Sequence, residues 1–218
     1  MALARIAFLS LASAAFGCAA PSKSHGWQTL LSERTRGSWR TADFAGGAAP
    51  EWVNGQLVLP AGSTLTGALW TGPLPTGAYE IELEAMRIEG KDIFCGLTFP
   101  VGSSAASLVL GGWGGSLCGI SSIDSLDASE NSTTRVIEFQ NGTWSRVQVR
   151  VTADRIEAWL DGESLVDVSI EGHRLDTRWE MRHAKPLGVA SYQTRAAVRG
   201  LRWRPLLESE AMRPAPAP

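Results

Sequence analysis

Tyr79-Glu80-Ile81-Glu82-Leu83-Glu84-Ala85 carries the clearest fold signal in the chain, because apolar and acidic residues alternate strictly along it. In an extended chain Ile81, Leu83 and Ala85 share one face, and the three glutamates share the other. This period of two is typical of a β-strand with one buried face. The stretch therefore predicts a strand that lies on a hydrophobic core and turns a row of carboxylates outward.

Similar short strands and turns fill the chain on both sides of this stretch. Asp161-Gly162 is a strong two-residue hairpin signal, because both residues tolerate the positive φ angles of such a turn. No segment keeps an apolar repeat of 3.6 residues for the length of a helix. Strands are expected at 93–99, 106–110, 116–120, 144–151, 155–160, 164–170, 187–192 and 197–203. The spacing predicts an all-β sandwich of two antiparallel sheets.

Length and charge narrow the class of protein. The chain has 218 residues and a formal net charge of -2, which suits one domain with a substantial core. A nucleic-acid-binding surface would need a basic stripe, and the sequence has none. Nine tryptophans supply flat apolar faces, although most of them are expected to fill the core. The sequence gives no sign of a cofactor and leaves the oligomeric state open.

The first residues predict export. Arg5 precedes an apolar run from Ile6 to Phe16, which has the length of a signal-peptide core and is too short to span a bilayer. The motif Ala15-Phe16-Gly17-Cys18 resembles the lipobox of bacterial lipoproteins, in which the cysteine is lipidated after cleavage. The expectation is an envelope lipoprotein held at the membrane only by its lipid. Ordinary secretory cleavage after Ala20 is the alternative.

These features divide the chain into four parts. Residues 1–18 are expected to be the signal peptide, 19–25 a tether, 26–207 the β-sandwich, and 208–218 a disordered tail rich in Pro and Ala. Once Cys18 is assigned to a lipid, Cys95 and Cys118 remain. An even pair in an oxidising compartment favours a disulfide. However, a strand between them would hold them about 9–10 Å apart, beyond the reach of a disulfide. Two free, buried thiols are therefore predicted. The cysteine and histidine spacings show no zinc motif.

Several short segments occur in an order typical of one known family. They are GWQTLL at 26–31, GSW at 37–39, EWVNGQL at 51–57, the strand at 79–88, WSRVQV at 144–149, DG at 161–162 and VRGLR at 198–202. Together they make the chain similar to the 3-keto-disaccharide hydrolase domain family. The resemblance implies a concanavalin A-like jelly roll with its ligand on the concave face. It also implies a carbohydrate ligand and cleavage of 3-keto sugars, whose ketone acidifies the neighbouring C–H.

Two stretches depart from the family pattern. Members usually carry Asn-Ser-Gly, and later an Arg, on the strand after the acidic one. Here that strand reads Phe94-Cys95-Gly96, with Pro100 near the place of the Arg. Members also carry a Gln and a His-Gly pair on a closing strand, where this chain has 188–193. Groups that contact the ligand are thus replaced, so the family activity does not transfer directly.

One candidate site is a glycine-rich turn followed by an acidic loop. Glycines flank Trp113 on both sides in the stretch 111–115 and let the backbone approach a ligand closely. The indole offers a face on which a sugar ring can stack. The loop that follows carries four polar candidates, which are Asp124, Asp127, Glu130 and Asn131. A suitably spaced carboxylate pair can act as acid and base in glycoside chemistry. A solvated loop with no ligand is the equally weighted alternative.

The glutamate row supplies the other candidates. Like charges two residues apart raise one another's pKa, which suits a proton-transfer group. We therefore expect Glu82, Glu84 and Asp124 to be catalytic. Trp113 and Tyr192 are expected to bind substrate in the same groove, together with Asp127, Glu130 and Asn131. The sequence thus predicts a hydrolase or lyase acting on 3-keto glycosides, and a non-catalytic carbohydrate-binding module remains the alternative.

Overall fold

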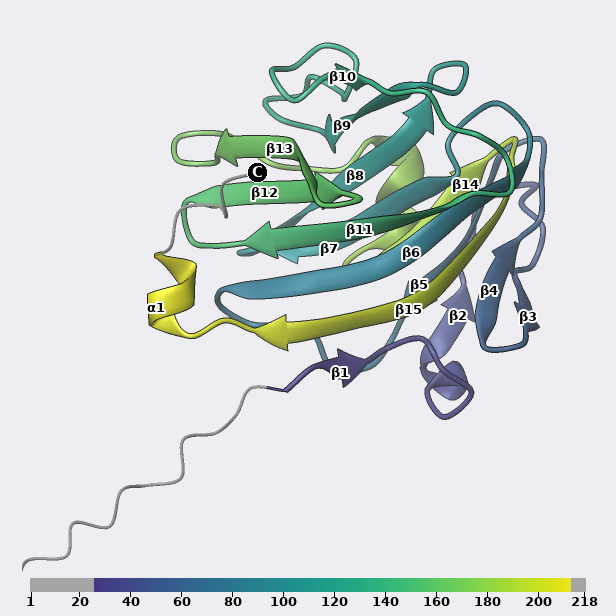
Figure 1. Ribbon diagram of the computed structural model, residues 1–218, viewed down its shortest axis with the longest axis horizontal. Coiled ribbons are helices and arrows are strands. Elements are labelled where there is room, and N and C mark those ends of the chain that lie inside the picture. Colours follow the sequence, from purple (N-terminus) through teal and green to yellow (C-terminus); the bar gives the residue numbers. More distant parts are fainter. Residues whose placement is uncertain (1–25, 213–218) are drawn as a thin grey trace, which may run out of the picture.

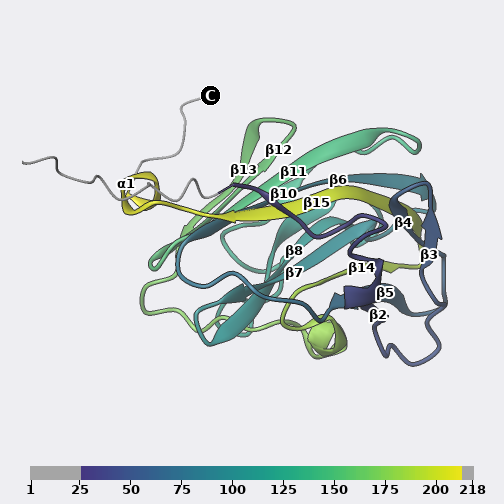
Figure 2. The ribbon, with the colours of Figure 1, turned by 90° about the horizontal axis from the view of Figure 1, so that it is seen from below.

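A computed structural model describes residues 26–212 and shows two antiparallel sheets packed face to face (Figures 1 and 2). Sheet A runs in the order β13-β12-β11-β6-β15-β4-β3, with β1 paired to β15. Sheet B runs β10-β9-β8-β7-β14-β5-β2. The predicted all-β sandwich is confirmed.

The strands of sheet A are β1 (Gln28–Thr29), β3 (Glu51–Val53), β4 (Gln56–Leu59), β6 (Tyr79–Glu89), β11 (Trp144–Val151), β12 (Arg155–Leu160), β13 (Glu163–Ser169) and β15 (Arg195–Pro205). Those of sheet B are β2 (Trp39–Thr41), β5 (Leu65–Trp70), β7 (Cys95–Val101), β8 (Ser104–Gly112), β9 (Leu117–Ser121), β10 (Arg135–Val136) and β14 (Gly188–Tyr192). The helical turns within the described range are η1 (Arg36–Ser38), η2 (Trp179–Ala184) and α1 (Glu208–Ala211).

The core lies between the sheets, where the sequence pattern places it. Ile81, Leu83 and Ala85 of β6 are at most 2% exposed. They face apolar residues of sheet B, which alternate in the same way along β7 and β8. Burial of such side chains stabilises the fold by roughly 1.5–3 kcal/mol for each large one. The hairpin between β12 and β13 turns at Asp161-Gly162, and both residues have positive φ as predicted.

The two cysteines of the core are free and buried, which confirms that part of the sequence analysis. Cys95 lies on β7 and Cys118 on β9, with β8 between them. Burial raises the pKa of Cys95 to about 12 and that of Cys118 to about 11. Both are therefore neutral thiols that pack as small apolar side chains.

The predictions for the N-terminal and C-terminal ends of the chain have different outcomes. The tail was expected to be unpacked from residue 208, and this is wrong for its first turn. α1 forms because Glu210 accepts hydrogen bonds from the Leu207 backbone N–H and from Arg204 on β15. The predicted signal peptide, Cys18 and the tether, like residues 213–218, lie outside the described residues. From 26 to 212, no helix is long and apolar enough to cross a bilayer.

Candidate functional site

A groove of about 740 Å³ opens on the outer face of sheet B. Strand alternation identifies this face: Leu97 and Leu108 point into the core, whereas Gly96 and Ser107 line the groove. The segment η2 covers part of the groove, and Figure 2 shows it as the yellow-green coil on the side of sheet B that faces away from sheet A. The groove is therefore separate from the core between the sheets.

Small residues of sheet B lie next to the groove, and one of them, Gly96, lines it. Gly67, Ala190 and Gly96 lie side by side on β5, β14 and β7. A Cβ atom at Gly96 would come within 3.2 Å of the Met181 side chain, and one at Gly67 within 2.9 Å of Phe44. Glycine is needed at these positions because other elements approach the sheet closely. The space that these side chains would take is occupied by Phe44 and Met181.

A second, smaller hydrophobic cluster holds η2 over these small residues. Met181 and Ala184 of η2 pack with Phe44, Leu65 and Ala190 of sheet B and its loops. This cluster is separate from the main core, so it fixes the position of η2 without closing the groove. Ser107 also lines the groove, and its hydroxyl is hydrogen-bonded to that of Thr98 at 2.8 Å. Beside them, the buried Ser121 hydroxyl has no hydrogen-bond partner among the described residues.

Two tryptophans stand at the rim of the groove. Trp113, on the turn between β8 and β9, is 43% exposed, and Trp179 of η2 is 69% exposed. Trp113 has a φ of 49°, an uncommon backbone conformation for a bulky residue. Arg178 lies 5.8 Å from the centroid of the Trp113 ring, and Arg182 lies 5.5 Å from that of Trp179. Exposed indoles beside hydrogen-bond donors are suited to binding a sugar ring.

Several titratable side chains converge on the same groove. Asp92 accepts backbone hydrogen bonds from Ile93 at 2.8 Å and from Gly114 at 3.4 Å. It forms no ion pair with any residue in the described range. His183 accepts a hydrogen bond from Arg182 at 3.0 Å through Nε2, which leaves the ring proton on Nδ1 when the imidazole is neutral. The backbone thus holds the Asp92 carboxylate in place, and no cation of the described segment forms an ion pair with it.

Glu180 differs from Asp92, because it is already paired. Arg178 donates to Glu180 at 3.0 Å and also to Asp127 at 2.5 Å. Burial alone would raise the pKa of Glu180, but the hydrogen bond from Arg178 lowers it below its ordinary value. Glu180 is therefore a charged structural partner of Arg178.

A second hollow, of about 370 Å³, adjoins the groove. Arg178, Trp179 and Glu180 line both spaces. Beyond this shared wall the hollow is lined by Ser122, Ser125, Asp127, Arg174, Asp176 and Thr177. The candidate site is thus elongated, with an exposed indole between its two parts.

The structure brings together only part of the predicted site. Trp113 and Tyr192 line the groove, and Asp127 lines the adjoining hollow. The expected placement of Glu82 and Glu84 in the same groove is wrong. They project from β6 on the outer face of sheet A, whereas the groove lies on sheet B. The alternation located the face of the strand correctly, but not the sheet that carries the groove.

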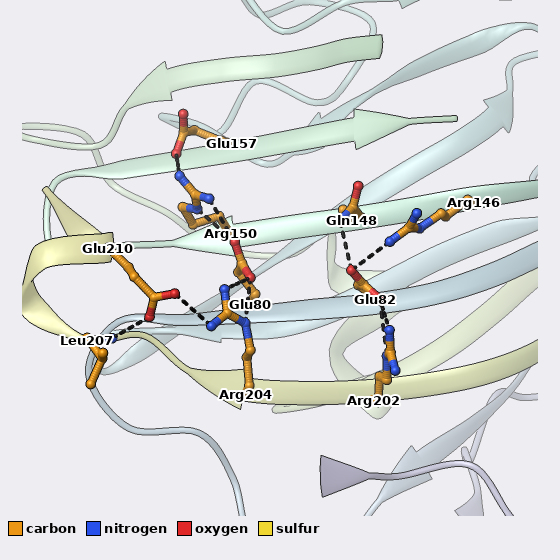
Figure 3. A network of polar contacts seen from close by, with 10 residues as sticks. All are labelled: Glu80, Glu82, Arg146, Gln148, Arg150, Glu157, Arg202, Arg204, Leu207 and Glu210. Atoms are coloured by element: carbon orange, nitrogen blue, oxygen red, sulfur yellow. Dashed lines mark hydrogen bonds and ion pairs between the residues drawn. The ribbon is translucent and has the colours of Figure 1, made fainter. Parts of the chain in front are cut away.

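The glutamate row forms a charge ladder with arginines of the neighbouring strands, and Figure 3 shows the part of it around Glu80 and Glu82. Glu80 pairs with Arg150 at 2.8 Å and Arg204 at 2.7 Å. Glu82 accepts from Arg146, Gln148 and Arg202. Glu84 accepts two hydrogen bonds from Arg199. The antiparallel register sets these side chains opposite one another.

This pairing reverses the pKa shift that the sequence suggested. Burial alone would raise the pKa of Glu82, but hydrogen bonds from Arg202 and Arg146 lower it. The hydrogen bonds from Arg199 lower the pKa of Glu84. Repulsion within the row was expected to raise both values, and the arginines outweigh it. Such carboxylates are structural anions rather than proton carriers at neutral pH.

The acidic loop after β9 is organised by its own hydrogen bonds. Asp124 accepts from the Arg174 backbone at 2.8 Å and pairs with His173 at 2.6 Å, and it lines neither hollow. The Asn131 side chain bonds the backbone of Ile120, Asp127 and Thr133. Glu130 is exposed and lines neither hollow. The expected convergence of Asp124, Glu130 and Asn131 on Trp113 is therefore wrong in its geometry.

Sequence reasoning missed the polar residues of the groove. Asp92 lies in the loop before β7, and the others come from the η2 region, where no strand pattern drew attention to them. The run Arg178-Trp179-Glu180 was the available signal, since an aromatic residue between opposite charges is unusual for a core. His183 was noted only as a loop histidine. In the described part of the chain, no group of three or more His, Cys, Asp or Glu side chains is placed to hold a metal ion.

Three solved structures of similar fold are distant in sequence. A putative glycosyl hydrolase from Parabacteroides distasonis has a TM-score of 0.53 at 16% identity, covering 85% of this chain and 96% of its own. A galectin-like protein from Bacillus subtilis has 0.54 at 11%, covering 82% and 94%. The carbohydrate-binding module CBM66 from Bacillus subtilis has 0.51 at 10%, covering 77% and 95%. These likenesses establish the lectin-like sandwich fold.

Comparison of sequences is more specific about the family than the comparison of structures, which shows the fold alone. None of the curated proteins matches the chain significantly. A family match, however, covers residues 24–204, which is nearly all of the sandwich. It agrees with the resemblance carried by the segments between 26 and 202. The chain belongs to the 3-keto-alpha-glucoside-1,2-lyase-like domain family.

Proposed function

We propose that this protein binds a 3-keto glycoside in the groove on sheet B and cleaves it by elimination. The observation that carries the proposal is the groove itself, in which exposed indoles and an unpaired carboxylate line one space. Its volume lies in the range typical of small-molecule sites. The family membership and the glycosyl hydrolase and carbohydrate-binding module of similar fold support a sugar as the ligand.

The chemistry requires a base near the carbon next to the ketone. The base takes the proton from C2, the electron pair forms a C1–C2 double bond, and the bond from C1 to the glycosidic oxygen breaks. The leaving oxygen then takes up a proton. Asp92 is the proposed base, because it is fixed by backbone donors and bears no ion pair in the described range. A base in hydrogen-bond reach of its proton contributes about 10²–10⁴-fold to the rate.

Other groove residues have supporting roles in this proposal. Trp113 and Trp179 supply stacking faces, and Tyr192 supplies a phenol that can donate to a sugar hydroxyl. Arg182 is the cation of the groove that pairs with no carboxylate in residues 26–212, so it can stabilise the developing enolate oxygen. The Ser121 hydroxyl offers a further polar contact in the groove.

The test compares two carboxyl-to-amide variants on plain and 3-keto disaccharides. Asp92→Asn is expected to lower the release of monosaccharide at least 100-fold and to leave binding of the 3-keto sugar within about threefold. Glu84→Gln, which alters a carboxylate on the opposite sheet, is the matched control and should retain full turnover. Product is measured by chromatography and binding by calorimetry. Undiminished turnover in Asp92→Asn would remove Asp92 from the mechanism.

A second variant tests the place of binding. Trp113→Ala should weaken sugar binding by about 2- to 10-fold, because aromatic stacking contributes about 0.5–1.5 kcal/mol beyond buried area. The exposed position of Trp113 means that thermal unfolding should change little. Unchanged affinity would contradict the groove as the sugar site.

A non-catalytic carbohydrate-binding module is the second candidate. It is favoured by the replacement of family polar residues with Phe94 and Cys95, whose side chains are buried in the core. The same plain and 3-keto disaccharides distinguish the two candidate functions. Binding without any released product, in a protein whose Trp113→Ala variant loses affinity, would support the module.

A further inference from the structure

The second hollow continues the proposed sugar site. It shares Arg178, Trp179 and Glu180 with the groove, so a ligand that stacks on the exposed Trp179 ring can reach both spaces. Each space also contains a buried hydroxyl that has no hydrogen-bond partner in residues 26–212. This is Ser121 in the groove, 1% exposed, and Thr177 in the second hollow, 7% exposed. Buried polar atoms in proteins are normally hydrogen-bonded, so these two are candidates for ligand contact.

The carboxylates of the second hollow are already paired. Asp127 and Glu180 both bind Arg178. Asp176 binds Lys185 and also accepts the Thr177 backbone N–H. Hydrogen bonding to Lys185 lowers the pKa of Asp176, so it remains an anion at neutral pH. None of the three is left to attract a cationic ligand.

Arg174 has a different environment. Its guanidinium donates to the hydroxyl of Ser125, and it forms no ion pair with any residue between 26 and 212. The nearby Asp124 accepts the backbone N–H of Arg174 and pairs with His173 instead. Arg174 is thus the cation of this hollow whose charge is not matched by a bonded carboxylate. A guanidinium with free N–H groups favours a planar or tetrahedral anion.

We propose that the second hollow holds the next sugar unit of the ligand and that Arg174 binds an anionic substituent on that unit, a carboxylate or a sulfate ester. The proposal extends the site of the proposed function and rests on it. The preferred ligand is then an acidic disaccharide, with one ring in the groove and the charged ring beyond Trp179. Thr177 would hydrogen-bond the charged ring.

The test measures binding by calorimetry in low salt to the full-length protein. The probes are maltose and cellobiose, their 3-keto forms, the matching disaccharides whose second ring carries a C6 carboxylate, and inorganic sulfate. The acidic disaccharide should bind about tenfold more tightly than its neutral counterpart, as one charge-assisted contact at an accessible arginine implies. Arg174→Gln should abolish this preference, and Arg174→Lys should retain most of it.

Arg40→Gln is the control, because Arg40 is an exposed arginine on β2, at the opposite edge of sheet B. It should leave the preference unchanged. Equal affinity for acidic and neutral disaccharides, or a preference that persists in Arg174→Gln, would overturn the inference and leave the groove proposal standing. Sulfate alone binding as tightly as the acidic sugar would also overturn it, since the hollow would then be an anion site unrelated to sugar. If no disaccharide binds at all, the proposed function itself fails.

Discussion

At the scale of single residues, the environment decides what each side chain can do. Asp92 and Glu82 are both carboxylates near a sheet, but their partners differ. Glu82 is surrounded by arginines, which lower its pKa and hold it as a structural anion. Asp92 receives only backbone N–H groups in the described range and lines a groove. A carboxylate is therefore proposed as a base because of the residues around it and not because of its residue type alone.

The two core thiols give a prediction at this scale. Burial raises the pKa of Cys95 to about 12 and that of Cys118 to about 11, and only the thiolate reacts rapidly with disulfide reagents. At pH 8 the folded protein with Cys18→Ser should therefore show almost no reaction with an aromatic disulfide reagent. Two thiols should react within minutes after unfolding in guanidinium chloride. Fast labelling of the folded chain would contradict their burial.

At the scale of elements, β6 links its neighbours through charge. The glutamates of β6 pair with arginines of β11 on one side and β15 on the other. Several of these arginines also stack on tryptophans, as Arg199 does on Trp144 with 4.0 Å to the ring centroid. Hydrogen bonds to charged groups contribute about 1.5–3 kcal/mol when they are partly shielded from water. The outer face of sheet A is thus stabilised by the ladder.

The ladder predicts a pH dependence of stability. The folded-state pKa values of Glu82 and Glu84 are lowered, so their contribution is fully present above the ordinary glutamate pKa of about 4.5 and is lost as pH falls below it. The free energy of unfolding should therefore decrease from pH 5 to pH 3. In a Glu82→Gln, Glu84→Gln double variant this decrease should be shallower, and stability at pH 7 should be lower by about 1–3 kcal/mol. Urea unfolding at each pH measures the free energy of unfolding of both proteins. If this free energy falls equally steeply with pH in the parent protein and in the double variant, Glu82 and Glu84 are not the source of the pH dependence.

The contact between η2 and sheet B predicts a second effect. Gly96 leaves room for Met181, whose side chain would be 3.2 Å from an added Cβ. Gly96→Val should therefore displace η2 or fill part of the groove, and sugar affinity should fall at least tenfold. Gly37→Ala is the control, because a Cβ there meets nothing within 4 Å. Calorimetric titration measures the affinity, and circular dichroism verifies that the sheets persist. Unaltered affinity in Gly96→Val would show that this part of the groove does not contact the ligand.

At the scale of the whole molecule, the two faces of the sandwich have different characters. The outer face of sheet A is covered by paired charges, whereas that of sheet B carries small residues, a covering helical turn and the two hollows. We propose that the molecule presents the sheet B face to sugars while tethered through its N-terminal segment. The tether stays a prediction, because residues 1–25 lie outside the described part.

The prediction for that segment concerns the mature N-terminus. The Arg5 start, the short apolar run and the motif ending at Cys18 indicate lipidation of Cys18. Expression in a bacterium that processes lipoproteins should yield a chain beginning at Cys18 with the added mass of its acyl groups. Cys18→Ala should abolish this modification and release the protein from the membrane fraction. Mass spectrometry of the N-terminal peptide tests this prediction. A free N-terminus at Ala19 or Pro21 would refute lipidation of Cys18.

The fold class and much of the strand pattern can be predicted from local sequence patterns. Alternation along 79–85 and 144–151 and the Asp161-Gly162 turn are local signals, because side-chain direction in a strand reverses at every residue. The free state of Cys95 and Cys118 also followed, since strand spacing is a fixed length. Trp113 and Tyr192 were placed at the groove because turn glycines and the family resemblance both pointed to their segments.

The outer face that carries the groove could be identified only from the packing of the two sheets. Alternation tells which residues face away from the core, but it is identical for the outer faces of both sheets. The arginines that pair with Glu82 and Glu84 come from residues more than 60 positions away, brought alongside by antiparallel register. The small residues Gly67, Gly96 and Ala190 become neighbours only when β5, β7 and β14 lie side by side. A site assembled from distant strands depends on their order in the sheet, and no local pattern encodes that order.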